Sequence, residues 1–372
     1  MSETVAEESI TKLSVNDIKP NMVLARDVET DSGKVILPKD TMLSSTNYSS
    51  LISSGVKDVY IVSDSISEES EDFTKSDQSS LQLQKIPIED RPEFISFRDV
   101  VDSKTEKAKQ CVLAISDGGQ IDLQEMFAIS NDIMSTLRFK NELLTFLGFI
   151  KQSDEHTFHH SVNVSLLCNL YGQWLALPSD ELVQLTTAGL LHDIGKTKIT
   201  NEILNKKDKL TDEEFDTIKK HPVMGYRILQ NQDIPECIKL GALMHHERID
   251  GSGYPMGLKD DKIDKVAKII AICDIYDAMT ANRVYRSKIC PFEVIKTFET
   301  RVYGELDTYY LLVFLKNIAS TYVGSWVQLT NGMEAEVLFI NKSQLSRPIV
   351  RTTNEVFIDL SREKDVSIIS LV

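Results

Sequence analysis

All seven histidines of this 372-residue chain lie between positions 156 and 246. They are His156, His159, His160, His192, His221, His245 and His246. Scattered structural histidines do not cluster in this way, and Asp193 directly follows His192. Imidazoles and carboxylates are common ligands of transition metals. The chain must therefore adopt a fold that brings several separate segments to one centre.

The region that carries the histidines, residues 153–318, is nearly all helical in its apolar pattern. Asp180 and Thr211 are expected to be the N-caps of two of its helices. Thr211 opens a TDEE run in which Glu214 has the capping-box position. The fold class predicted for this region is mainly α.

One apolar helix contains two acids. The run VAKIIAICDIYDAM includes Asp274, and burying an ionised carboxylate in such a helix is costly without a partner. We therefore expect Asp274 to meet a metal ion or a cation. Asp277 is expected to reach solvent at the helix edge instead.

Four motifs of this region resemble those of the HD-GYP family. They are HD before IGK at 192–196, HPVMGYRIL from His221, HHERIDGSGYP from His245, and AICDIYDAMTANRVYR ending at Arg286. Their order and approximate spacing are those of the family, over roughly residues 153–318. The resemblance implies an HD-type helical bundle and a metal-dependent phosphodiesterase. The implied reaction is hydrolysis of cyclic di-GMP to pGpG, GMP or both, by attack of a metal-bridging hydroxide.

The resemblance also implies a set of metal ligands. By family position they are His160, His192, Asp193, His221, His245, His246 and Asp274, with Asp193 as the bridging carboxylate. These suit two divalent ions, with iron or manganese expected and nickel or zinc also compatible. Some family members hold a third ion through a glutamate four residues before the first histidine. His156 occupies that position here, which favours two ions. Pairing Glu155 with His159 would restore the spacing and ranks second.

Substrate-binding residues are carried over in the same way. Lys196, one turn after the HD pair, is expected to be catalytic and to balance charge growing on the phosphate. Arg283 and Arg286 match positions that the family uses for phosphate or guanine. The loop at the mouth of the site is expected to include Asp250, Gly253, Tyr254 and Pro255.

The remaining segments predict a multidomain chain. Residues 1–62 have the pattern of a small N-terminal α/β domain, regulatory or merely accessory, and residues 63–93 form an acidic, serine-rich linker. Residues 94–152 are predicted to be connecting helices, either extra parts of the catalytic bundle, which we favour, or a dimer-forming stalk. Residues 319–372 change to an alternating period and predict a small C-terminal β tail with a hairpin around Asn331 and Gly332.

The charge and composition of the chain limit the classes of partner that it can bind. The net charge of −15 argues against general binding to nucleic acid or to an anionic membrane. No apolar run is long enough to span a bilayer, and the five dispersed cysteines predict free thiols, so a cytoplasmic location is expected. Formation of a homodimer is considered. The loop that contains Gly253, Tyr254 and Pro255, called the GYP loop below, is also considered as a contact for a diguanylate cyclase or another protein. Two alternative functions remain: a cyclic di-GMP receptor without turnover, and an HD phosphohydrolase acting on another nucleotide.

Overall fold

The computed structural model describes residues 10–18, 22, 24–29, 35–37, 43, 51, 56–62, 88–138, 142–150, 156–206, 208–280 and 289–372. The chain divides into two units, residues 1–91 and 92–372. Most of the predicted acidic linker, residues 63–87, lies outside the described residues.

The first unit contains short strands and an apolar core. Its strands are β1 (Ile10–Ser14), β2 (Val28–Glu29), β3 (Val35–Leu37) and β4 (Asp58–Val62), and the single-turn 3-10 helices are η1 (Val15–Asp17) and η3 (Ile88–Asp90). β1 pairs antiparallel with β4, and β2 pairs antiparallel with β3. Ile18, Leu24 and Ile61 are among the side chains buried in its core.

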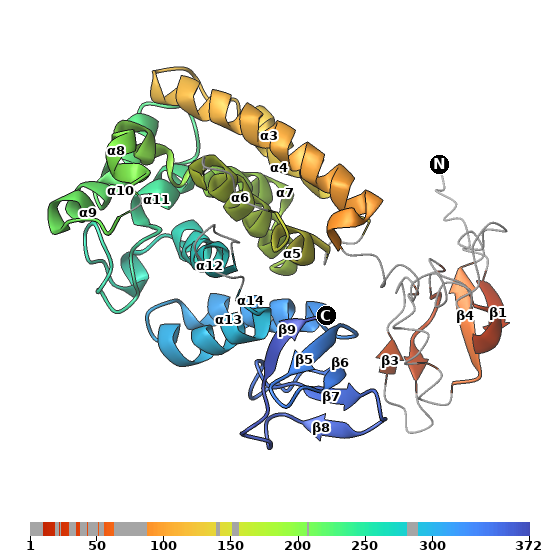
Figure 1. The fold of residues 1–372 in the computed structure, drawn as a ribbon. Coiled ribbons are helices and arrows are strands. Elements are labelled where there is room, and N and C mark those ends of the chain that lie inside the picture. Colours follow the sequence, from red (N-terminus) through yellow and green to blue (C-terminus); the bar gives the residue numbers. More distant parts are fainter. Residues whose placement is uncertain are drawn as a thin grey trace, which may run out of the picture. The chain divides into compact units, whose positions relative to one another are not determined.

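The second unit is mainly helical, as the sequence predicted (Figure 1). Its α-helices are α3 (Pro92–Ser116), α4 (Leu123–Ser135), α5 (Glu142–Leu147), α6 (His156–Trp174), α7 (Ser179–Leu191), α8 (Asn201–Leu204), α9 (Asp212–Ile218), α10 (His221–Leu229), α11 (Glu236–Met244), α12 (Lys265–Thr280), α13 (Pro291–Thr297) and α14 (Thr308–Thr321). The 3-10 segments η4 (Ile194–Lys198) and η5 (Asp260–Lys262) and the π-helical segment η6 (Phe298–Val302) lie between them.

The centre of this bundle is α6, which packs against α7 and α12. Residues 161–172 of α6 are buried without interruption, as expected for a helix that other helices surround. Its buried polar side chains find partners on the neighbouring helix. Ser165 Oγ donates to the carbonyl oxygen of Thr186 at 2.7 Å, and Asn169 Nδ2 donates to Thr186 Oγ1 at 3.2 Å. These bonds fix the position of α6 against α7, at whose end the HD pair lies.

The helices before the histidine region pack on the same bundle. α3 and α4 contact each other and α6, α4 also contacts α7, and α3 reaches η4 (Figure 1). Side-chain hydroxyls join α3 to η4 directly, because Ser116 Oγ and Thr197 Oγ1 lie 2.6 Å apart. α3 therefore forms one wall of the region that follows the HD pair.

One of the two predicted N-caps is present. Thr211 caps α9 with a complete capping box, in which its hydroxyl accepts from the Glu214 N–H and the Glu214 carboxylate accepts from the Thr211 N–H. The prediction for Asp180 was wrong, because α7 begins at Ser179 after Pro178. Proline at that point already sets the entry of the chain, and Asp180 lies in the first turn, where its charge suits the helix dipole.

The C-terminal part is the predicted β tail. β5 (Trp326–Leu329), β6 (Glu334–Phe339), β7 (Ile349–Thr352), β8 (Phe357–Asp359) and β9 (Ile368–Leu371) form an antiparallel sheet in the order β8-β7-β6-β5-β9. β5 and β6 make the predicted hairpin, with Gly332 at its turn at a φ of 82°. β9 contacts α13, and Figure 1 shows the sheet beside the last helices.

Two further expectations concern side chains and membranes. All five cysteines are free thiols, as predicted. Among the described residues, no helix combines the length and the apolar character that crossing a bilayer requires.

Candidate metal centre

The fold gathers the seven predicted ligands from separate elements into two adjoining groups. One group contains Asp193, His221, His245 and His246, and the other contains His160, His192 and Asp274. Within each group the potential ligand atoms lie within 4.8 Å of one another. α6 and α12 each supply one side chain, and the others lie at the end of α7, the start of α10 and the end of α11.

Asp193 stands between the two groups. Its Oδ1 lies 3.2 Å from His221 Nε2 and 3.8 Å from His245 Nε2. Its Oδ2 lies 3.3 Å from His192 Nε2 and 3.7 Å from His160 Nε2. Each carboxylate oxygen thus faces a different set of imidazoles, which is the arrangement needed for one carboxylate to serve two cations.

Backbone carbonyls set the tautomers of three of these rings. His192 Nδ1 donates to Gly189 O at 2.8 Å, and His221 Nδ1 donates to Ile218 O at 2.8 Å. His245 Nδ1 donates to Gly241 O at 3.1 Å. A neutral imidazole that carries its proton on Nδ1 has a lone pair on Nε2. All three rings therefore present an unprotonated nitrogen towards Asp193, which is the form that binds a metal ion.

The donor set fits metal ions for a second reason. His192 Nε2 and Asp193 Oδ1 are buried and have no hydrogen-bond partner among the described residues. A buried acceptor without a partner is costly, and acceptors facing one another cannot satisfy each other. A cation between them removes that cost, and histidine nitrogens with carboxylate oxygens are suitable ligands for divalent transition metals.

Protonation of the site agrees with this chemistry. Burial by itself raises the pKa of Asp193, but Lys196 and His192 outweigh it and bring the pKa well below its usual range. Lys196 Nζ lies 2.5 Å from Asp193 Oδ2. Burial lowers the pKa of His246 to about 3, and burial together with the neighbouring rings holds the pKa of His245 well below its usual value. At neutral pH the carboxylate is charged and these two imidazoles are neutral.

Asp277 orients His160, and the expectation that it reaches solvent was wrong. It is 3% exposed, and its Oδ2 lies 2.7 Å from His160 Nδ1 while its Oδ1 accepts from Asn163 Nδ2 at 2.9 Å. On the other side of the ring, His160 Nε2 lies 3.1 Å from Asp274 Oδ1. Burial lowers the pKa of His160, but hydrogen bonds to Asp274 and Asp277 outweigh it and raise the pKa to about 10. The spacing of three between the acids, which puts both on one helix face, was the signal that could have identified Asp277.

Two glycines allow the motifs to approach one another. A Cβ on Gly195 would lie 1.9 Å from the carbonyl oxygen of His221 and 2.5 Å from the amide nitrogen of Gly225. A Cβ on Gly253 would lie within 2.5 Å of the backbone from His246 to Arg248. The first glycine lets η4 pack on α10, and the second lets the GYP loop fold back on the histidine pair.

Glu247 holds the GYP loop, a role that was not predicted. Its side chain is buried, and its carboxylate accepts from Met256 N at 2.7 Å and from Leu258 N at 2.8 Å. The Tyr254 ring stacks on His246, with the ring centroids 4.6 Å apart at 26°. The loop is thus held against the histidine pair by the tyrosine ring and by the glutamate that follows the pair. An acid directly after two buried histidines was the sequence signal for this role.

The remaining predicted residues do not join the two groups. Some of them lie elsewhere in the structure, and others are outside the described residues. Asp250 is exposed and its Oδ1 accepts from Ser252 N and Oγ. Arg283 and Arg286 lie outside the described residues, and so does the side chain of His156, the first residue of α6. His159 Nε2 lies 3.5 Å from Asp102 Oδ1 of α3.

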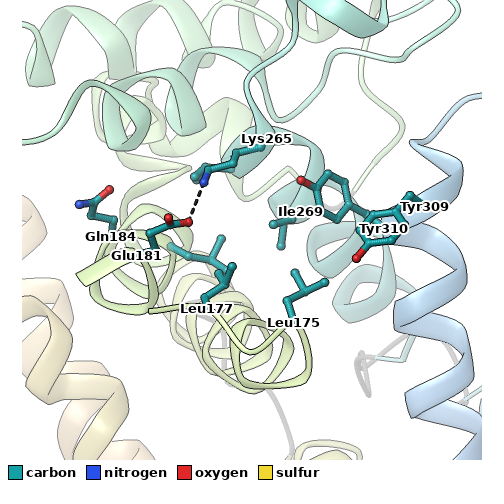
Figure 2. A pocket seen from close by; sticks show the side chains of 10 residues that line it. Leu175, Leu177, Glu181, Gln184, Lys265, Ile269, Tyr309 and Tyr310 are labelled. Carbon is teal, nitrogen blue, oxygen red and sulfur yellow. Dashed lines mark hydrogen bonds and ion pairs between the residues drawn. The ribbon is translucent and has the colours of Figure 1, made fainter. Parts of the chain in front are cut away.

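A cavity away from the histidines has a different character. It encloses about 160 Å³ beside the first turns of α7, α12 and α14. Figure 2 shows apolar side chains such as Ile269 around it and the ion pair between Lys265 and Glu181, whose charged atoms lie 2.6 Å apart. None of the predicted metal ligands lines this cavity. The described residues that line it include no histidine, so the histidine centre remains the candidate active site.

Comparison with known proteins agrees with this geometry. The family model described as HD domain matches residues 147–307. The match covers the region that carries the histidines, which is less than half of the chain. The HD domain starts at the end of α5 and finishes before α14, so it contains all seven predicted ligands, whereas α3 and α4 precede it. HD-domain hydrolases are metal-dependent enzymes.

Curated relatives of the HD domain confirm the recognition made from the motifs. A cyclic di-GMP phosphodiesterase of Pseudomonas aeruginosa is 38% identical over 58% of this chain and 52% of its own length. A cyclic di-GMP phosphodiesterase of Thermotoga maritima is 38% identical over 40% of this chain and 41% of its own length. A 3'3'-cGAMP-specific phosphodiesterase of Vibrio cholerae is 33% identical over 52% of this chain and 48% of its own length. The chain spans about half the length of the curated relatives it matches.

Proposed function

We propose that this protein hydrolyses cyclic di-GMP, giving pGpG, GMP or both, at a centre of two divalent metal ions. The observation that carries the proposal is the position of Asp193, whose two carboxylate oxygens face two different groups of imidazoles. Each ion would share the Asp193 carboxylate and would have three further side chains as ligands. These are His221, His245 and His246 for one ion, and His160, His192 and Asp274 for the other. Iron or manganese is the expected metal, and nickel or zinc is also compatible with these ligands.

The residues of the centre have distinct roles in this proposal. Divalent ions bound there would supply positive charge to the phosphate oxygens and lower the pKa of a nucleophilic water. The imidazoles of His192, His221 and His245 present unprotonated Nε2 atoms for binding, and their carbonyl partners keep them in that form. Lys196 lies beside the shared carboxylate, where its ammonium group can stabilise charge that develops on the phosphate.

Cyclic di-GMP is the proposed substrate because several relatives of the HD domain are phosphodiesterases of that dinucleotide. A second candidate substrate is 3'3'-cGAMP, which other relatives cleave. Both molecules carry two phosphodiester groups, so the metal chemistry is the same for either. Arg283, Arg286 and the loop residues Asp250, Gly253, Tyr254 and Pro255 are proposed to contact the nucleotide.

The test is a turnover assay on protein purified anaerobically, with its metal content measured on the same sample. Cyclic di-GMP and 3'3'-cGAMP are supplied separately, and the linear dinucleotide and mononucleotide products are separated by chromatography. We expect metal-dependent hydrolysis of cyclic di-GMP, abolished by a chelator and restored by iron or manganese. Tight binding without product would instead identify a receptor. Faster turnover of 3'3'-cGAMP would assign the second substrate.

Three further parts of the proposal concern the setting of the protein. We propose a cytoplasmic location, which the free state of the five thiols supports. A homodimer and a partner protein at the GYP loop, such as a diguanylate cyclase, are also proposed. Size measurement by light scattering and a binding assay with an immobilised cyclase test these two contacts.

A further inference from the structure

A hollow of about 450 Å³ adjoins the metal centre on the side of α3. Its walls come from α3, α6, η4 and α8, and its lining includes Lys109, Leu113, Phe158, Lys196 and Asn201. This volume is in the range of small-molecule sites in proteins. Two of these residues, Lys109 and Leu113, precede the HD domain, which begins at residue 147.

Lys196 connects the hollow to the metal centre. Its side chain lines the hollow, and its Nζ lies 2.5 Å from Asp193 Oδ2. Thr157, another lining residue, lies one helical turn before His160 on α6. A molecule whose phosphate reaches the metal centre past Lys196 can therefore extend into this hollow.

The lining suits a nucleotide. On a chain with a net charge of −15, the described residues that line the hollow include two lysines and no aspartate or glutamate. Phe158 is half-buried on α6, and Leu113 is 40% exposed on α3. Aromatic and aliphatic side chains bind the faces of nucleobases, and an amide such as Asn201 can pair with a base edge. Positive charge and apolar surface thus occur together in one hollow.

We propose that this hollow binds the half of the cyclic dinucleotide that is not being cleaved, with Lys109 pairing with its second phosphate. The nucleobase of that half packs between Phe158 and Leu113. The inference rests on the proposed function, and it assigns substrate binding to a helix that the HD domain does not include. Substrate preference then depends on α3 as well as on the motifs of the HD domain.

The position of α3 is suited to this role because hydrogen bonds hold the helix at that wall. Ser116 Oγ lies 2.6 Å from Thr197 Oγ1, one residue after Lys196. Further along the chain, Gln232 accepts from Ile121 N at 3.1 Å and donates to Gly119 O at 2.8 Å, which fixes the segment after α3. Lys109 Nζ lies 4.0 Å from Glu106 Oε2 on the same helix, an ion pair with which a phosphate can compete.

The experiment compares Lys109→Ala with the control variant Lys107→Ala. Both remove one positive charge from α3, but Lys107 does not line the hollow and pairs with Glu125 instead. A second pair of variants introduces a negative charge on α3. Leu113→Asp places it in the hollow, and the control Ala114→Asp places it at the adjacent exposed residue, which does not line the hollow. The full-length, metal-loaded protein is used. Kd is measured with a phosphorothioate analogue of cyclic di-GMP that is cleaved slowly, and KM and kcat with cyclic di-GMP.

Lys109→Ala and Leu113→Asp are expected to raise Kd and KM about tenfold, with KM rising more than kcat falls, because a charge-assisted contact to substrate is lost or opposed. The two control variants should keep the wild-type values. Equal Kd values for Lys109→Ala and Lys107→Ala would overturn the inference even if cyclic di-GMP is hydrolysed normally. Analogue binding that depends on Lys109 in a protein without turnover would support this inference and overturn the proposed hydrolysis. A wild-type protein that binds no analogue would overturn both.

Discussion

The Nε2 atoms of His221 and His245 lie 3.2 Å apart in the interior of the helical unit. Both rings give their Nδ1 protons to backbone carbonyls, so both Nε2 atoms carry lone pairs. Two lone pairs at this distance repel each other, and neither ring has a proton to share with the other. A cation bound by both nitrogens converts this repulsion into attraction. The contact therefore supports a metal centre independently of any sequence motif.

Asp193→Ala should abolish hydrolysis of cyclic di-GMP and lower the metal content of the purified protein. The side chain lies between both groups of imidazoles, and without it two cations would repel each other with no shared anion. We expect kcat to fall at least about a hundredfold. Mutating a residue that only hydrogen-bonds to a metal ligand already lowers metal affinity or activity by up to about that factor. Metal analysis and turnover are measured together, with the surface variant Asp216→Ala as control. Wild-type activity with metal retained would remove Asp193 from the centre.

Lys196→Ala should keep the metal ions and lose rate. The ammonium group lies beside Asp193, but its proposed action is electrostatic and directed at the phosphate, so we expect a loss of roughly a hundredfold in kcat. Lys198→Ala is a matched control, because that lysine is exposed and lies near Asp117, 3.6 Å away. Metal loss on substitution of Lys196 would contradict this role and assign the lysine to the integrity of the site.

Asp277→Asn should weaken metal binding without unfolding the protein. The variant keeps the size of the side chain but removes the charge that accepts from His160 Nδ1 and Asn163 Nδ2. Partners of metal-bound histidines typically contribute about 10-fold to 100-fold in metal affinity. Competition with a fluorescent chelator measures the affinity, and Asp264→Asn, at the start of α12, is the control. Unchanged metal affinity would show that Asp277 has only a packing role.

The metal-free protein should become less stable as pH rises from 7 to 8. The pKa of His160 is raised to about 10 in the folded chain, from 6.5, so the folded state keeps a proton that the unfolded state has lost. A raised pKa of this kind contributes stability that is complete below 6.5 and is lost as pH approaches 10. The expected slope is about −1.4 kcal/mol of unfolding free energy per pH unit.

Denaturant unfolding at several pH values measures this slope, and the window ends at pH 8, below the usual pKa of cysteine, so that thiols contribute little. His160→Ala should remove the slope, whereas His159→Ala should leave it in place. Metal-loaded protein should also lack it, because a bound cation replaces the proton on His160. A slope that survives His160→Ala would show that another group carries the proton.

Much of the fold followed from local patterns in the sequence. Thr211 and Glu214 are three residues apart and form the predicted capping box, since both partners lie within one turn. The Asn331 and Gly332 hairpin also depends only on neighbouring residues. The candidate ligands were found through motifs, and the structure brings their side chains together, although their binding of metal remains a prediction.

Contacts between distant segments could not be predicted in the same way. Asp277 meets His160 across 117 positions of sequence, so its burial depends on how α12 packs against α6. The hollow beside Lys196 depends on α3, whose docking on η4 no local pattern encodes. Asp180 was mistaken for a cap because proline at position 178 already fixes the start of α7.

The most direct test of the account is a crystal structure of the anaerobically purified protein with anomalous diffraction measured at the absorption edge of its metal. We predict two anomalous peaks, one beside Asp193 Oδ1 with His221, His245 and His246, and the other beside Oδ2 with His160, His192 and Asp274. A single peak away from Asp193 would contradict the shared carboxylate. Three peaks with His156 bound to one of them would contradict the count of two ions.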